Sequence, residues 1–246
     1  MTARPRSVAA ENPLPVPAPR KPVAVRPVPQ NIVVRTLSDQ VFEIVRERIV
    51  TGSLPDDAPI RQDALANELG VSKIPLREAL GRLEQEGLLV SQANRGYSVR
   101  PMSADQADEI YALRLSIEPV AAARAAMHAT EQDRAEAIAA FHALDEAAHS
   151  NLAEVAVRNR DFHVALVRPG GRRLTTQLVE RLSILAERYV ITHLEPAGRD
   201  ARAHLEHRHL IDAWMARDVA VLQTLLHQHI EATLWDLRAQ FAAGDS

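Results

Sequence analysis

Two short helical segments joined by a two-residue connection constrain the fold of this chain most strongly. Residues 61–69 (RQDALANEL) place apolar side chains at helical spacing, and Gly70 follows as a stop signal. Ser72 is placed to cap a second helix that runs to residue 86, with Pro75 in its first turn, where a missing backbone N–H costs little. So short a connection between two helices is typical of a helix-turn-helix.

The flanking segments extend this unit on both sides. Residues 36–50 predict a helix capped by Ser38 and stopped near Gly52, with four apolar residues on one face: Val41, Ile44, Val45 and Ile49. Downstream, the runs LLVSQ and YSVRP flank a polar turn that contains Gly96, which predicts a β-hairpin. Residues 36–101 therefore predict three helices followed by a hairpin, the order of a winged helix-turn-helix.

The remaining parts of the chain differ sharply from this unit. Residues 1–30 hold eight of the fifteen prolines, so we expect a disordered tail there, with a basic arm that touches DNA phosphates as the alternative. From Ser103 onward the pattern is helical and carries no strand signal. It predicts six helices, near residues 103–128, 131–149, 151–168, 172–193, 199–216 and 218–242. Four of their predicted starts are Ser103, Thr130, Ser150 and Asp218.

The expected fold class is thus mainly α. We divide the chain into a proline-rich tail (1–30), a winged helix-turn-helix domain (31–101) and an all-α six-helix bundle (102–246). No cysteine occurs, which excludes disulfides and thiolate metal sites. No apolar run is long enough to cross a membrane and no secretory signal is visible, so we expect a cytoplasmic protein.

The second helix of the helix-turn-helix carries cations at its N-terminus. Lys73 and Arg77 lie four residues apart, so they share a face in the first turns, where the helix dipole disfavours positive charge. This placement makes sense if phosphates or guanines bind there, because the second helix enters the major groove N-terminus first. Ser72 can bind a phosphate, and Arg95 beside Gly96 can reach an adjacent groove. The alternative is a set of solvated surface cations.

The stretch RQDALANELGVSKIPLREALGRLEQEGLL followed by NRGYSV resembles the GntR family of bacterial winged-helix transcription factors. The resemblance implies that the partner is double-stranded operator DNA. It implies that Ser72, Lys73 and Arg77 read the operator, and that the tip formed by Arg95 and Gly96 enters the minor groove.

Two positions depart from the family pattern. Arginine is the commoner residue at position 73, and Lys73 keeps the charge but lacks the bidentate fork that arginine presents to guanine. Family members often carry a basic residue in the preceding helix. Here Asp63 stands near that place, and Arg61 is the nearby cation that could contact DNA.

Histidine is confined to one part of the chain. All ten histidines lie between His128 and His229. Helical spacing turns three of them inward on three different helices: His163, His207 and His229. Three imidazoles converging from separate helices could bind one divalent ion, and the alternative is a set of hydrogen-bonded core residues. His193 shows no register with the others.

The body also resembles the FadR-type C-terminal ligand-binding domain (FCD) through LRLSIEPVAAARAA, NRDFHVAL, EHRHLIDAWMARD and HQHI. Many such domains bind a metal through one acid and three histidines. The resemblance implies that His163, His207 and His229 are ligands, with zinc as the first candidate ion. The position of the acid is occupied by Asn159, which offers a neutral carbonyl oxygen.

The same resemblance implies a small-molecule effector, often a small carboxylate or sugar acid that contacts the metal and an arginine. Arg114 is the candidate partner, and its alternative role is a salt bridge to Glu118, four residues on. Arg188 and Tyr189 are further candidates for effector binding, whereas Trp214 is expected in the core.

We therefore predict an effector-responsive transcription regulator that binds a two-fold operator as a homodimer, with repression as the usual mode of the family. A metal-dependent enzyme fused to a DNA-binding module is the alternative. We expect no enzyme, because the sequence has no HExxH motif, nucleophile elbow or P-loop. A purely architectural protein, which would bind DNA regardless of any small molecule, is a third interpretation.

Overall fold

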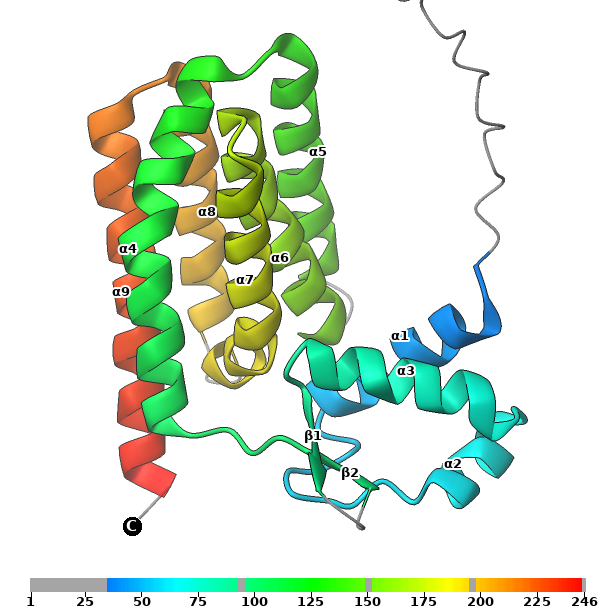
Figure 1. Cartoon of the computed structure of the whole chain (residues 1–246). Helices are drawn as coiled ribbons and strands as arrows, with labels where there is room; N and C mark the ends of the chain where they lie inside the picture. The colour runs from blue at the N-terminus through cyan, green and yellow to red at the C-terminus, as the bar shows by residue number, and fades with distance from the viewer. Residues whose placement is uncertain (1–34, 93–95, 149–151, 195–197, 245–246) are drawn as a thin grey trace, which may run out of the picture. The chain divides into compact units, whose positions relative to one another are not determined.

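A computed structural model describes residues 35–92, 96–148, 152–194 and 198–244. Figure 1 shows its elements, which are, in chain order, α1 (Leu37–Val50), α2 (Gln62–Leu69), α3 (Lys73–Gln85), β1 (Leu89–Gln92), β2 (Gly96–Val99), α4 (Ala104–His128), α5 (Glu131–Ala147), α6 (Leu152–Val167), the 3-10 helix η1 (Arg168–Gly170), α7 (Arg173–Leu194), α8 (Arg199–Ala216) and α9 (Val219–Gly244). The mainly α fold class is confirmed. The predicted tail, Arg95 and the predicted cap Ser150 lie outside these ranges.

The first three helices and the hairpin form one small core. Strands β1 and β2 pair antiparallel, with Leu89 opposite Val99, as the hairpin prediction requires. The core is apolar throughout and is built from residues of all five elements and the α1–α2 loop, including Phe42, Val45, Ile49, Ile60, Leu65, Leu76, Leu80, Leu83, Leu89 and Val99. The predicted order of three helices and a hairpin is therefore confirmed.

The start of α1 differs from the prediction. Thr36, rather than Ser38, is the N-cap: its hydroxyl accepts the backbone N–H of Asp39, and the Asp39 carboxylate accepts the backbone N–H of Thr36. A capping box needs an acid three residues after the cap, which Thr36 has and Ser38 lacks, because Val41 stands there. Ile44, predicted to be buried, is exposed at the edge of the buried stripe.

The turn between α2 and α3 follows the sequence signals closely. Gly70 ends α2 in the left-handed conformation, with φ of +65°, which a side chain would strain. Ser72 occupies the N-cap position of α3, but its hydroxyl makes no capping hydrogen bond. The predicted buried face of α3 is confirmed, because Leu76, Ala79, Leu80 and Leu83 are all buried. The N-terminal backbone N–H groups of α3 are thus not capped by Ser72.

The six helices α4 to α9 form the predicted bundle, in which α4 runs alongside α9 (Figure 1). Ser103 and Thr130 cap α4 and α5 as predicted, and the Asp218 carboxylate accepts a backbone N–H in the first turn of α9. Trp214 is fully buried and donates its indole N–H to the Leu166 carbonyl oxygen at 2.9 Å, which confirms its core assignment. No helix in the described ranges is long and apolar enough to cross a membrane.

Candidate effector and metal site

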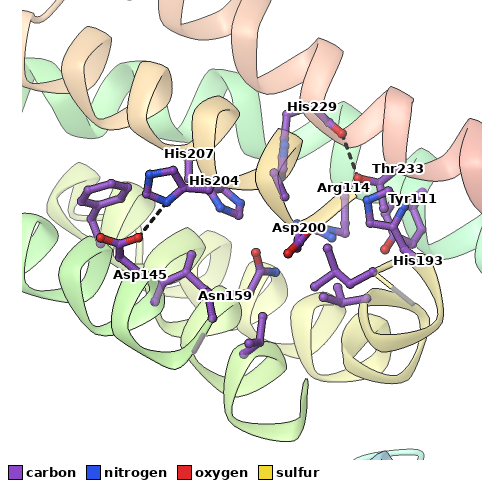
Figure 2. Close-up of a pocket in the computed structure, with 17 residues that line it drawn as sticks. Tyr111, Arg114, Asp145, Asn159, His193, Asp200, His204, His207, His229 and Thr233 are labelled. Atoms are coloured by element: carbon purple, nitrogen blue, oxygen red, sulfur yellow. Dashed lines mark hydrogen bonds and ion pairs between the residues drawn. The ribbon is translucent and has the colours of Figure 1, made fainter. Parts of the chain in front are cut away.

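A cavity of about 280 Å³ lies inside the helical bundle. All six helices contribute to its wall, and Figure 2 shows its polar side chains, which are Tyr111, Arg114, Asp145, Asn159, His193, Asp200, His204, His207, His229 and Thr233. Its volume is at the small end of the range of ligand pockets in proteins. The cavity therefore suits a small, polar molecule.

The three histidines predicted to face inward converge beside this cavity. His163 comes from α6, His207 from α8 and His229 from α9, and one ring nitrogen of each lies within 4.8 Å of the other two. All three residues are buried. The Nε2 atoms of His163 and His207 are buried and have no hydrogen-bond partner among the described residues. Buried polar atoms are rarely left unpaired, so this donor set fits a divalent metal ion.

The environment of His163 and His207 keeps these two histidines neutral. Burial lowers the pKa of His163 to about 4, although the neighbouring Glu118 carboxylate opposes the shift. Burial, together with the other imidazoles of the cluster, also lowers the pKa of His207 well below its ordinary value. Neutral imidazole is the form that binds a metal, so these ligands need not lose a proton at neutral pH.

Asn159 lies one turn before His163 on α6, is 8% exposed and lines the cavity. The structure therefore places it next to the histidine cluster, as the metal prediction requires. Its amide is uncharged, so Asn159 and the three histidines together form a neutral set of ligand atoms.

Arg114 was predicted either to contact the effector or to form a salt bridge with Glu118, and its position allows both. Its guanidinium makes a two-point salt bridge to Glu118, with Nε at 2.6 Å from Oε1 and Nη2 at 3.3 Å from Oε2. It also lines the cavity. Burial disfavours the charged form of Glu118, but Arg114 and His163 outweigh burial and hold its pKa at about 2. Glu118 is therefore an ionised carboxylate directly behind the histidine cluster.

The exposed face of α3 carries the residues predicted to read DNA. Ser72, Lys73 and Arg77 are exposed, as is Ile74 between the two cations. Lys73 forms a salt bridge with Asp63 of α2, so DNA would have to displace or share this partner. Arg61 is exposed just before α2, and Gly96 begins β2 with φ of +80°, a conformation that favours glycine.

Comparison with known proteins agrees with this geometry in both parts of the chain. The family model for bacterial regulatory proteins of the GntR family matches residues 37–99, and the model for the FCD domain matches residues 109–232. The chain belongs to the GntR family. It is a DNA-binding transcription regulator with a C-terminal FCD effector-binding domain.

Individual relatives of this GntR regulator are similar over most of their length. The uncharacterized HTH-type transcriptional regulator BphR of Paraburkholderia xenovorans strain LB400 is 31% identical over 82% of this chain and 85% of BphR. The HTH-type transcriptional repressor GlaR of Escherichia coli K12 is 29% identical over 77% of this chain and 90% of GlaR. The solved structure of E. coli McbR/YncC, at 25% identity, superposes with a TM-score of 0.68 over 84% of this chain and 99% of that one.

Arg188 and Tyr189 of the regulator are not among the residues that line the cavity. Arg188 donates to the Arg100 carbonyl oxygen at 2.5 Å and forms an ion pair with Asp56, in the loop that follows α1. The Tyr189 hydroxyl donates to the Ser103 carbonyl oxygen at 3.2 Å. Among the described residues, α7 contributes Val190, His193 and Leu194 to the cavity wall instead. These two predicted effector contacts are therefore engaged in holding other segments of the chain.

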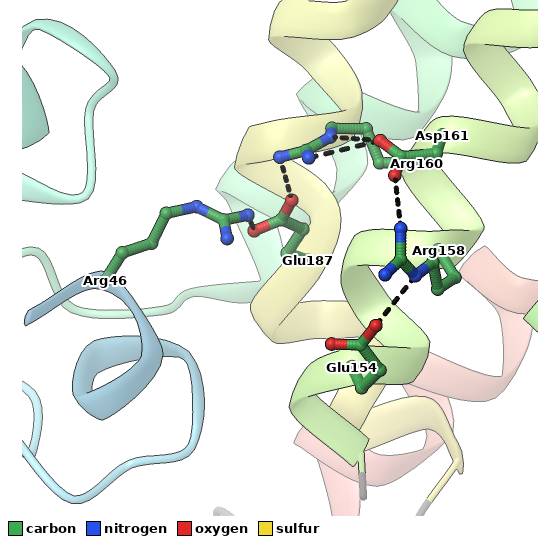
Figure 3. A network of polar contacts seen from close by, with 6 residues as sticks. All are labelled: Arg46, Glu154, Arg158, Arg160, Asp161 and Glu187. Atoms are coloured by element: carbon green, nitrogen blue, oxygen red, sulfur yellow. Dashed lines mark hydrogen bonds and ion pairs between the residues drawn. The ribbon is translucent and has the colours of Figure 1, made fainter. Parts of the chain in front are cut away.

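A polar network joins α6 and α7 to the first helix of the DNA-binding region (Figure 3). The buried Glu187 carboxylate pairs with Arg46 of α1 and with Arg160 of α6, the latter at 2.9 Å. Burial raises the pKa of Glu187 to about 7, against the opposing effect of the two arginines. Arg160 follows Asn159 directly, so the network begins one residue from the cavity wall.

Sequence reasoning missed several polar residues around the cavity, among them His193, His204, Asp145 and Glu206. His193 is buried on its wall, where helical spacing from Ala186 and Val190 could have placed it. His204 Nδ1 lies 2.8 Å from the Asp145 carboxylate. Glu206 accepts from the Nδ1 atom of His229 at 2.6 Å across two helices, a contact that no sequence pattern indicates.

Proposed function

We propose that this GntR-family regulator is a repressor whose affinity for operator DNA changes when a small carboxylate or sugar acid binds in the cavity together with a divalent metal, with zinc as the first candidate. The observation that carries the proposal is the cluster of three buried imidazoles at the cavity, two of which have buried Nε2 atoms without a partner in the described chain. Such atoms are costly unless something binds them.

The residues divide the task of binding between them. His163, His207 and His229 would hold the metal, with Asn159 as a fourth, neutral ligand. A bound divalent ion would supply positive charge for an anionic effector. Arg114 would add a guanidinium at the cavity wall while its salt bridge to Glu118 keeps it in place. An effector of this size and charge fits a cavity of about 280 Å³.

Operator recognition is assigned to the start of α3. Ser72, Lys73 and Arg77 are exposed on one face of its first turns, with Arg61 close by in sequence at the start of α2. We assign the hairpin tip at Arg95 and Gly96 to the adjacent minor groove, from the resemblance of this region to GntR regulators. The DNA-binding domain would span residues 31–101 and the effector domain residues 102–246.

Signal transmission from the cavity to the DNA-binding region is assigned to the Glu187 network. Asn159 lines the cavity, and its neighbour Arg160 pairs with Glu187, which in turn pairs with Arg46 of α1. A change of α6 at the cavity would thus alter a buried ion-pair network that reaches α1. A buried carboxylate between two arginines responds strongly to small displacements, because Coulomb energies are large where water is excluded.

We propose that the regulator acts as a homodimer through α4 and the start of α7. Leu113, Val120 and Met127 repeat every seven residues along α4 and are 44%, 64% and 54% exposed. Leu174 and Leu178 add a second exposed apolar pair on α7. A seven-residue apolar repeat on a helix surface is typical of helix-helix association. A dimer would present two copies of α3 to a two-fold operator.

The proposal assigns no enzymatic activity. Both carboxylates in contact with the cluster are engaged: Glu118 with Arg114, and Glu206 with Arg202 at 3.4 Å. Neither is available as a general base for a metal-bound water. The alternative, a metal-dependent enzyme fused to a DNA-binding module, predicts turnover of a bound carboxylate, whereas a regulator predicts saturable binding without turnover.

The proposal is tested with operator DNA selected from a random pool, using fluorescence anisotropy. We expect Arg77→Ala to weaken binding by about 1–3 kcal/mol, roughly 5- to 150-fold, while Arg238→Ala, at an exposed cation of α9, has little effect. With zinc present, one or more small carboxylates or sugar acids should weaken operator binding. Equal loss in both variants, or operator affinity indifferent to the whole panel, would contradict the proposal.

A further inference from the structure

Two carboxylates contact the histidine cluster, and each contacts the Nδ1 atom of a different histidine. Glu118 Oε2 lies 2.9 Å from His163 Nδ1, and Glu206 Oε2 lies 2.6 Å from His229 Nδ1. An ionised carboxylate can only accept a hydrogen bond, so we assign the proton of each ring to Nδ1. Arg114 Nη2 also lies 3.3 Å from His163 Nδ1, but the Glu118 oxygen at 2.9 Å is closer, so the carboxylate contact decides the tautomer of His163. Each of these two neutral rings therefore has its free lone pair on Nε2.

The three imidazole rings lie close to one another. The ring centroids of His163 and His229 lie 5.5 Å apart, and those of His207 and His229 lie 4.7 Å apart. Nε2 of His163 is buried without a partner among the described residues, as is Nε2 of His207. The carboxylates thus select the tautomer that leaves Nε2 of His163 and His229 free to bind an ion, in a cluster where one ring nitrogen of each histidine lies within 4.8 Å of the others.

The charge of the cluster also supports a role for the two carboxylates. Asn159 and the three imidazoles bring no negative charge, so a divalent ion bound to them would keep its full positive charge in a buried place. Negative charge lies one hydrogen bond further out, on Glu118 and Glu206. A carboxylate that accepts from a ligand imidazole both orients the ring and makes it a better electron donor.

We propose that Glu118 and Glu206 are positioning residues of the metal site, which hold His163 and His229 in the Nδ1–H tautomer so that both Nε2 atoms face one ion. This inference rests on the metal site of the proposed function. It adds two residues that are not ligands, and it predicts that metal affinity depends on them.

The two positions differ in what else depends on them. Glu118 is fully buried and held by Arg114, so its replacement would also break a core salt bridge. The Glu206 side chain is 29% exposed, and it also pairs with Arg202, whose side chain is 41% exposed. Glu206 can therefore be changed with less damage to the fold, and it is the position to test.

Asp145 provides a matched control. Its carboxylate contacts His204 Nδ1 at 2.8 Å, on the wall of the same cavity, and its side chain is 34% exposed. His204 is outside the cluster of three. Asp145→Asn therefore removes the charge of a histidine-bound carboxylate without touching a ligand of the proposed site.

The experiment measures zinc affinity of the full chain by competition with a chromophoric chelator. The unfolding midpoint of the zinc-free proteins is measured in parallel. We expect Glu206→Gln to weaken zinc binding by about 10- to 100-fold and Asp145→Asn to leave it within about threefold. In zinc-free protein labelled with ¹⁵N-histidine, we expect His229 to change from the pure Nδ1–H tautomer in the wild type to a mixture in Glu206→Gln.

The outcomes separate the two proposals. If the wild type binds zinc but Glu206→Gln binds it equally well, the positioning role is wrong and the metal site stands. An equal loss of affinity in Asp145→Asn would overturn the positioning role too, because it would trace the effect to general cavity charge. If the wild type binds no zinc, the metal site and the positioning role fail together.

Discussion

The buried pair of Arg114 and Glu118 allows the two predicted roles of Arg114 to be measured separately. The pair is buried, with side chains 4% and 1% exposed, and the closest atoms are 2.6 Å apart. At a charge separation of roughly 4 Å and an effective dielectric constant of about 20, the attraction between the two charges is about 4 kcal/mol. Arg114→Met removes this attraction and leaves the Glu118 carboxylate buried without its main partner.

We expect Arg114→Met to lower the free energy of unfolding of the metal-free protein by about 3–5 kcal/mol, the usual result of leaving one charge of a buried pair. The double variant Arg114→Met with Glu118→Leu should recover most of this loss, to within about 1–2 kcal/mol of wild type, because apolar residues of similar volume can replace a buried ion pair. Urea unfolding followed by circular dichroism measures all of these values, and Glu118→Leu alone completes the double-mutant cycle.

Effector binding separates the second role from the first. The double variant has a repaired core but lacks both the guanidinium at the cavity wall and the Glu118 carboxylate beside His163. It should therefore fold but bind zinc more weakly, and at saturating zinc it should show reduced affinity for anionic effectors. The reasoning would be refuted if Arg114→Met left stability unchanged, or if the double variant were no more stable than Arg114→Met. Undiminished effector binding by a folded double variant would restrict Arg114 to its structural role.

Three further predictions concern acid stability, signalling and assembly. Burial lowers the pKa of His163 and His193 to about 4 from 6.5, so the unfolded chain binds more protons than the folded chain between these pH values. The free energy of unfolding of the metal-free protein should therefore fall by up to roughly 3 kcal/mol per histidine as the pH falls from 6.5 to 4. Urea unfolding measures this loss, and a pH-independent midpoint would contradict it. Glu187→Gln should reduce the effector-induced change in operator affinity while effector affinity stays the same, as followed by anisotropy; an unaltered response would remove Glu187 from the signalling network. Val120→Glu should shift the sedimentation coefficient from the dimer value to the monomer value, whereas Val221→Glu, at a 45% exposed residue of α9, should not. A dimer in both variants would show that α4 is not the interface.

Local sequence signals predicted the fold well because each element carries its own signal. Gly70 ends α2 as its position predicted, and Leu76, Leu80 and Leu83 face the core as their spacing predicted. The wrong cap Ser38 shows the limit of single-residue signals: the capping box is a two-residue pattern, and Thr36 with Asp39 satisfies it.

The candidate site was predictable where helical spacing alone determines direction. His163, His207 and His229 could be turned inward from the faces of their own helices, and the structure brings them together. Contacts between helices could not be predicted in the same way. The bond from His229 to Glu206 joins α9 to α8, and Arg188 finds Asp56 more than a hundred residues away in sequence. Such partners depend on how helices are packed, which spacing within one helix does not encode.

The central claim is that the three buried histidines form a metal site that serves the effector. The most direct test is the metal content of untagged, purified protein by elemental analysis, with His163→Ala measured beside it. The account predicts close to one equivalent of zinc or another divalent ion per chain in the wild type and a marked loss in His163→Ala. A wild-type protein that stays metal-free after incubation with zinc, or equal metal in both proteins, would contradict it.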